Sequence, residues 1–142
     1  MRALLDVNVL IALLDPDHAL HARAREWFGA EARAGWASCP LTQNGCMRIM
    51  SHPRYANPVP VASVMRHLRE AVADSHHAFW PDDISLLDEK LADATRIHGS
   101  RQLTDLYLLA LAVRHGGRFV TFDGAISISA IKTASRRHLV AL

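Results

Sequence analysis

The chain has few of the features that mark membrane proteins, secreted proteins or zinc proteins. None of its apolar runs approaches the roughly 20 residues that a membrane-spanning helix needs. Its two cysteines, Cys39 and Cys46, lack CxxC spacing, which argues for a reducing compartment and against a zinc site. Asp6 interrupts the first apolar residues and no small-residue cleavage site follows, so the start does not resemble a signal peptide. We therefore expect a cytoplasmic protein without a membrane segment.

The chain also lacks a strong net charge, repeats and low-complexity segments. Its formal net charge is +2, and only two of its 16 basic residues are lysines. The planar guanidinium of arginine suits phosphate groups, so this balance is compatible with nucleic acid. Hydrophobic residues make up 50% of the 142 residues, and we expect a partner to cover part of this apolar surface. With no visible linker, we predict a single domain over residues 1–142.

Short apolar runs alternate with amphipathic stretches along the whole chain. The pattern predicts strands at 4–5, 36–39, 78–80, 119–121 and 138–140. It predicts helices at 8–14, 18–34, 42–51, 61–73, 85–97 and 104–115, and a proline-containing loop at 52–60. Asp17 is expected to cap the second helix, and Asp82 or Asp83 the fifth. Such alternation predicts an α/β fold with a central, mostly parallel sheet flanked by helices.

Two aspartates directly follow predicted buried strands near opposite ends of the chain. Asp6 ends the first apolar run, and Asp123 ends the run Phe-Val-Thr-Phe that begins at Phe119. Because the carboxyl ends of parallel strands meet at one edge of a sheet, we expect both side chains at that edge, where ligands gather. A carboxylate at a buried strand end needs hydrogen bonds or a cation. For Asp123 an aspartate turn before Gly124 is the alternative interpretation.

Asp105 is a third acid, in the first turn of the most apolar predicted helix. Its simplest role is an interaction with the helix dipole, which contributes about 0.3–1 kcal/mol. Together with Asp6 and Asp123, however, it gives three oxygen donors without any His or Cys spacing suited to zinc. Carboxylate donors of this kind are typical of sites for Mg²⁺ or Mn²⁺. The sequence therefore predicts a metal site formed by these three aspartates.

Three short motifs, in this order, resemble those of the PIN-domain ribonucleases. They are Asp6-Val-Asn8 after the first strand, Thr104-Asp105 at the start of an apolar helix, and Thr121-Phe-Asp123 after a late strand. The chain length and the mid-chain segment 40–48 are similar to those of the VapC toxins of bacterial toxin–antitoxin pairs. The resemblance covers essentially all 142 residues.

This resemblance implies a metal-dependent endoribonuclease toxin that hydrolyses RNA phosphodiester bonds. Asp6, Asp105 and Asp123 would be its catalytic acids and its ligands for Mg²⁺ or Mn²⁺, with Asn8 and Thr121 as polar supports. It also implies an RNA substrate, a cognate antitoxin protein and a homodimer.

The sequence departs from the family pattern at two positions. Val7 stands where the family often has threonine or serine. Asn44, by our alignment, stands where a glutamate is usual, which should weaken cation binding and disfavour a second metal ion. Asn44 could still offer its carbonyl oxygen to a metal or hold a water.

Two other interpretations compete with the ribonuclease. A degenerate PIN scaffold that binds RNA or a protein partner without cleaving is supported by Asn44. A haloacid-dehalogenase-type phosphatase also begins with an aspartate after a strand, but it needs a second acid where this chain has Asn8. In the ribonuclease, Arg48, Arg101 and Arg114 are candidates for holding the RNA backbone.

Overall fold

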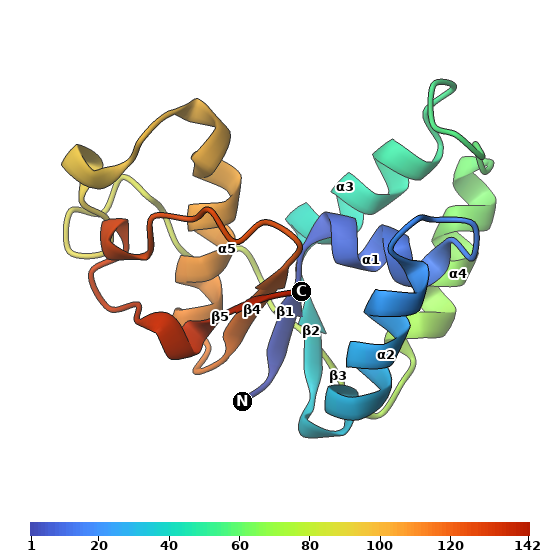
Figure 1. Cartoon of the computed structure of the whole chain (residues 1–142), viewed down its shortest axis with the longest axis horizontal. Coiled ribbons are helices and arrows are strands. Elements are labelled where there is room, and N and C mark those ends of the chain that lie inside the picture. The colour runs from blue at the N-terminus through green and yellow to red at the C-terminus, as the bar shows by residue number, and fades with distance from the viewer.

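A parallel sheet of five strands crosses the middle of the molecule in the order β3-β2-β1-β4-β5 (Figure 1). The computed structural model describes all residues from Met1 to Leu142. The strands are β1 (Ala3–Leu5), β2 (Trp36–Ser38), β3 (His77–Phe79), β4 (Arg118–Thr121) and β5 (Leu139–Ala141), and all neighbouring strands pair in parallel. The expected α/β class with a central parallel sheet is confirmed.

Helices cover both faces of this sheet, which gives three layers. The four helices on one face are α1 (Val7–Leu14), α2 (His21–Glu31), α3 (Pro40–Met50) and α4 (Val61–Val72) (Figure 1). The other face is covered by α5 (Leu103–Arg114) and by the irregular segments 80–102 and 122–138. None of the helices combines the length and the apolar character needed to cross a membrane.

The alternation of side chains along the short strands divides the core into two clusters. Leu4 and Phe119 point into the cluster that contains α5, whereas Leu5 and Val120 point into the cluster built on α1, α3 and α4. These four side chains are fully buried. A parallel strand covered on both faces is apolar at nearly every position, which explains why β1 and β4 appear in the sequence as uninterrupted apolar runs.

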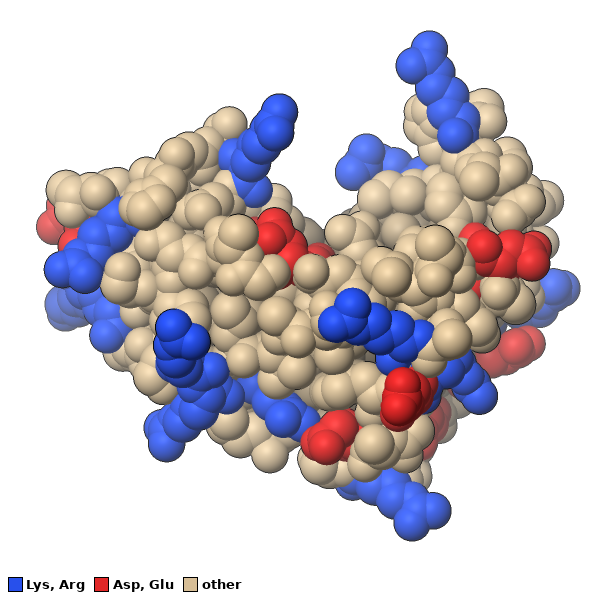
Figure 2. Space-filling view, in the orientation of Figure 1, with Lys and Arg blue, Asp and Glu red and all other residues tan.

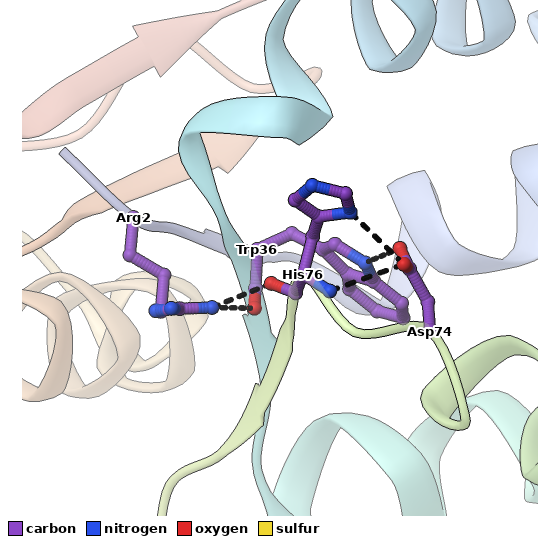
Figure 3. Close-up of polar contacts among 4 residues, drawn as sticks. All are labelled: Arg2, Trp36, Asp74 and His76. Atoms are coloured by element: carbon purple, nitrogen blue, oxygen red, sulfur yellow. Dashed lines mark hydrogen bonds and ion pairs between the residues drawn. The ribbon is translucent and has the colours of Figure 1, made fainter.

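At the amino edge of the sheet, polar contacts hold β2 and the start of β3 in place (Figure 3). The Arg2 guanidinium donates to the backbone carbonyls of Trp36, at 3.1 Å, and His76. The indole N–H of Trp36 donates to Asp74 at 2.9 Å, and Asp74 also accepts a hydrogen bond from the backbone N–H of His76. The indole hydrogen bond is the first cause of the low pKa of Asp74, about 2. These contacts have a structural role, and they lie at the edge of the sheet opposite the one that Asp6 follows.

The predicted helix at 85–97 is wrong: this segment forms turns and a single 3₁₀ turn at Ala94–Arg96. The side chains of Ser85, Asp88 and Asp93 each accept a hydrogen bond from the backbone N–H two residues later. Such local bonds compete with the backbone bonds of a helix. Because no helix follows, neither Asp82 nor Asp83 acts as the cap we expected.

The second helix begins at His21, three residues later than predicted. Asp17 does not cap it, because the N-cap position is Leu20, which has no side-chain cap bond. Asp17 belongs to the preceding turn, where its backbone N–H donates to the Asp15 carboxylate at 3.0 Å. His18 then accepts a bond from the backbone N–H of Leu20 at 3.0 Å, which prolongs the turn. The other predicted helices and strands are present, and none of their ends is displaced by more than two residues.

The order of the strands determines where a site can form. From β1 the chain moves outward through β2 and β3, then crosses to the other side of β1 to form β4 and β5. The direction of winding therefore changes between β1 and β4. In open α/β sheets the carboxyl ends of the two strands at such a switch point leave a crevice that binds ligands. Asp6 follows β1 and Thr121 ends β4, so both lie at this point.

Candidate active site

Asp6 is buried and oriented by hydrogen bonds on both of its carboxylate oxygens. It caps the N-terminus of α1, where Oδ1 accepts a bond from the backbone N–H of Val7 at 2.7 Å. Oδ2 accepts a bond from the Thr121 hydroxyl, also at 2.7 Å. Only 6% of Asp6 is exposed, and Thr121 is fully buried. Burial raises the pKa of Asp6, while the bonds from Thr121 and Val7 oppose this rise.

Thr121 connects Asp6 to Asp123. The same hydroxyl oxygen that donates to Asp6 accepts a hydrogen bond from the backbone N–H of Asp123 at 3.1 Å. The exposed Asp123 side chain accepts a bond from the backbone N–H of Ala125 at 2.9 Å. The aspartate turn is therefore present. Asp123 nevertheless lies within electrostatic range of Asp6, since its charge contributes to the raised pKa of Asp6.

Asp105 brings a third negative charge to this region from the first turn of α5. Its side chain is partly buried, and burial raises its pKa to about 6, with further contributions from the charges of Asp6 and Asp123. No hydrogen bond contributes to this pKa. The three aspartates thus lie close enough to act on one another electrostatically, although they are separated by up to 117 positions in the sequence (123 − 6).

A cleft opens from Asp6 toward α3. Its lining consists of Asp6, Val7, Asn8, Leu41, Asn44, Gly45, Arg48, Ile49 and Thr104. Gly45 allows α3 to approach α1 closely, because a Cβ atom at this position would lie 2.8 Å from a methyl group of Val7. This close packing brings Asn44 to the cleft. Figure 2 shows the hollow between the two halves of the molecule, with carboxylates at its floor and basic side chains on its rims.

Comparison with known proteins places this arrangement in a family. The sequence profile of the PIN domain matches residues 3–131. The chain belongs to the PIN-domain family. It is 52% identical to ribonuclease VapC44 of Mycobacterium tuberculosis over the full length of both chains. It is also 42% identical to ribonuclease VapC39 of the same species, over 92% of this chain and 94% of that protein. The resemblance to VapC-type PIN domains is therefore confirmed.

Solved structures agree with this assignment at the level of the fold. The crystal structure of VapBC2 from Rickettsia felis, bound to a promoter DNA fragment, gives a TM-score of 0.65 at 10% identity, over 100% of this chain and 99% of that chain. VapC20 of Mycobacterium tuberculosis, a toxin that cleaves the sarcin–ricin loop, gives 0.62 at 12% identity, over 91% and 95%.

The donors of this PIN domain fit a hard divalent cation in their chemistry. They are carboxylate, hydroxyl and amide oxygens, which such ions prefer. A bound cation would also relieve the electrostatic repulsion between the three aspartates. The side chains are not closed around a metal position: no three His, Cys, Asp or Glu residues of the chain stand close enough together to hold an ion. The cluster therefore has donor atoms and a negative charge that suit a divalent cation, but its side chains are more widely spaced than in a complete coordination shell.

The three arginines predicted to contact RNA lie in different places. Arg48 is exposed on α3 and lines the cleft. Arg101 is exposed in the 3₁₀ turn Ser100–Gln102 that precedes α5. Arg114 lies at the other end of α5, in a separate hollow with Asp83 and Asp88. Thr104 also lines the cleft. It belongs to the Thr104-Asp105 motif, which was the signal for it in the sequence, although no separate role was predicted for it.

Proposed function

We propose that this protein is a Mg²⁺- or Mn²⁺-dependent endoribonuclease toxin that hydrolyses RNA phosphodiester bonds. The observation that carries the proposal is the Thr121–Asp6 hydrogen bond at the switch point of a VapC-type PIN domain, with Asp105 and Asp123 in electrostatic range. In open α/β sheets, ligands bind outside the carboxyl ends of the strands at such a switch point.

Each residue has a role that follows from its contacts. Asp6, Asp105 and Asp123 would hold the divalent ion. When bound, the ion would act as a Lewis acid that offsets negative charge on the phosphoryl oxygens. The Thr121 hydroxyl orients the Asp6 carboxylate and fixes the backbone that carries Asp123. Asn8 and Asn44, both exposed in the cleft, would bind water or substrate hydroxyls. Because Asp105 has a pKa of about 6, it is ionised at neutral pH and ready to bind a cation.

We also propose a homodimer that a cognate antitoxin neutralises. Besides the acidic cleft, the surface has an apolar hollow between α1, α2 and α4, which includes Leu10, Leu13, Leu14, Phe28 and Leu68. Apolar side chains of a partner would bury this surface. Sedimentation of the purified chain at micromolar concentration, alone and with the product of an adjacent antitoxin gene, tests both parts. A monomer unaffected by that product contradicts them.

The nuclease proposal is tested with antitoxin-free protein and total bacterial RNA, in EDTA and then with added Mg²⁺ or Mn²⁺. Asp6→Asn, Asp105→Asn and Asp123→Asn should each abolish cleavage while circular dichroism shows a folded chain. Asp17→Asn removes an exposed carboxylate that does not line the cleft and lies beyond the end of α1 opposite Asp6, so it is the matched control. Full activity in two of the three cleft variants would refute the site. RNA binding without cleavage by the wild type would favour the degenerate scaffold.

A further inference from the structure

Beyond the acidic cleft, a second hollow continues along the outer end of α3. It is lined by Arg48, Ile49, His52, Arg54 and Tyr55, which we call the α3 rim. Arg48 and Ile49 line both the cleft and the α3 rim, so the two hollows are adjacent. In Figure 1, α3 runs outward from the sheet and the following loop projects beyond it. A strand leaving the acidic cleft along α3 would therefore pass over this surface.

The charges of the α3 rim are free to bind an anion. No carboxylate lines the hollow, and none of the salt bridges in the chain includes Arg48 or Arg54. Both side chains are exposed. Arg48 lies one turn after Asn44 on the same face of α3, so successive steps of four residues advance about 6 Å along the helix axis. Arg48 on α3 and Arg54 in the loop that follows α3 are therefore two cations that the phosphate backbone of such a strand would pass.

The loop that carries Arg54 is held by defined contacts. The Tyr55 hydroxyl donates to the buried Asp15 carboxylate at the end of α1. The backbone N–H of Arg54 donates to the His52 ring at 3.0 Å. Further along, the backbone N–H of Val59 donates to the carbonyl of Met50 at 2.9 Å. Because Tyr55 is anchored through its hydroxyl, its ring has a fixed position in the hollow, where it can serve as a stacking surface.

We propose that the α3 rim is a nucleotide subsite, which binds the single-stranded RNA next to the bond that is cleaved. Arg48 and Arg54 would bind phosphates, and an unstacked base would lie against the ring of Tyr55. Aromatic rings and arginines together are typical of surfaces that bind single strands without strict sequence preference. A duplex should bind poorly, because its bases are already stacked. This proposal rests on the proposed RNA substrate.

The test measures fluorescence anisotropy of a labelled single-stranded oligoribonucleotide in the Asp123→Asn background, with a gel to check that the RNA stays intact. Arg48→Ala and Arg54→Ala should each weaken binding by about fivefold to tenfold near 50 mM salt, and lower the salt slope by about 0.7 per lost phosphate contact. Arg33→Ala is the matched control, because it removes one exposed charge just before β2, at the opposite edge of the sheet. It should change affinity by less than about twofold.

Two tyrosine variants separate stacking from anchoring. Tyr55→Leu should weaken binding by about tenfold, whereas Tyr55→Phe, which keeps the ring but loses its anchor on Asp15, should weaken it by no more than about threefold. In proteins with an intact acidic cleft, the arginine variants should raise KM more than they lower kcat. Thermal denaturation controls for folding.

The outcomes are distinguishable. If the wild type cleaves RNA but both arginine variants match Arg33→Ala, the subsite is refuted and the nuclease stands. If the wild type neither binds nor cleaves RNA, both proposals fail. Unchanged RNA affinity with lost antitoxin binding would assign the α3 rim to a protein partner and also overturn the subsite.

Discussion

Asp105→Asn should stabilise the metal-free protein at neutral pH, although it removes a proposed catalytic group. The Asp105 carboxylate is partly buried and lies near the charges of Asp6 and Asp123, and no hydrogen bond contributes to its pKa. Ionising it in the folded chain is therefore unfavourable. Asparagine has nearly the same shape and carries no charge, so the substitution relieves the repulsion without opening a cavity.

The size of this effect follows from the pKa. Burial and the two neighbouring charges raise the pKa of Asp105 from 3.8 to about 6. One pKa unit corresponds to about 1.4 kcal/mol, so a shift of about two units gives an upper value just under 3 kcal/mol. Because the side chain is partly exposed, solvent screens the interaction, and we expect about 1–2 kcal/mol.

The pH dependence gives the prediction its sign. With a folded-state pKa above the unfolded value, Asp105 favours folding fully below about pH 4, and this contribution is lost as the pH rises through about 6. The free energy of unfolding of Asp105→Asn should therefore match that of the wild type near pH 4 and exceed it by about 1–2 kcal/mol at pH 7.5. Urea denaturation in EDTA, with Asp17→Asn as control, measures this difference.

Saturating Mg²⁺ should reduce or reverse this difference in the free energy of unfolding. A ligand that binds only the folded state stabilises it by mass action, and we expect the wild type to bind the ion more tightly than Asp105→Asn. A variant that is equally stable or less stable than the wild type at pH 7.5 in EDTA would refute the reasoning. Asp105 would then not share the field of Asp6 and Asp123.

The sequence could predict most of the sheet and the position of its acids. Buried parallel strands are apolar throughout, so β1 and β4 are visible as apolar runs, the first ended by Asp6 and the second by Asp123. Parallel pairing then requires both ends to lie at one edge. The segment 85–97 shows the limit of periodicity: its apolar residues fit a helix, but Asp88 and Asp93 bond their own backbone and form turns instead.

Relations between helices were less accessible from the sequence. Which arginine reaches the cleft depends on how α3 and α5 are placed against the sheet, and no local pattern encodes this placement. Arg48 and Arg114 both lie near the ends of predicted helices, so the sequence does not distinguish them. In the structure Arg48 lines the cleft, whereas Arg114 lies at the far end of α5. Gly45 was a usable signal in retrospect, because a helix with a glycine at its contact face can approach its neighbour closely.

Two further substitutions test the cleft itself. Thr121→Val removes the hydroxyl that donates to the buried Asp6 carboxylate, and should lower the free energy of unfolding by about 1–3 kcal/mol at neutral pH, with Thr121→Ser as control. Asn44→Glu adds a negative charge to the cleft that contains Asp6. A fourth carboxylate strengthens attraction for a divalent ion and, without the ion, raises the pKa values of its neighbours. Calorimetric titration should therefore show tighter Mg²⁺ or Mn²⁺ binding than in the wild type, with a steeper loss of affinity as pH falls. Asn44→Gln, which lengthens the side chain without charge, should leave the affinity unchanged; equal affinities for Asn44→Glu and Asn44→Gln would mean that this position of α3 lies outside the field of the metal site.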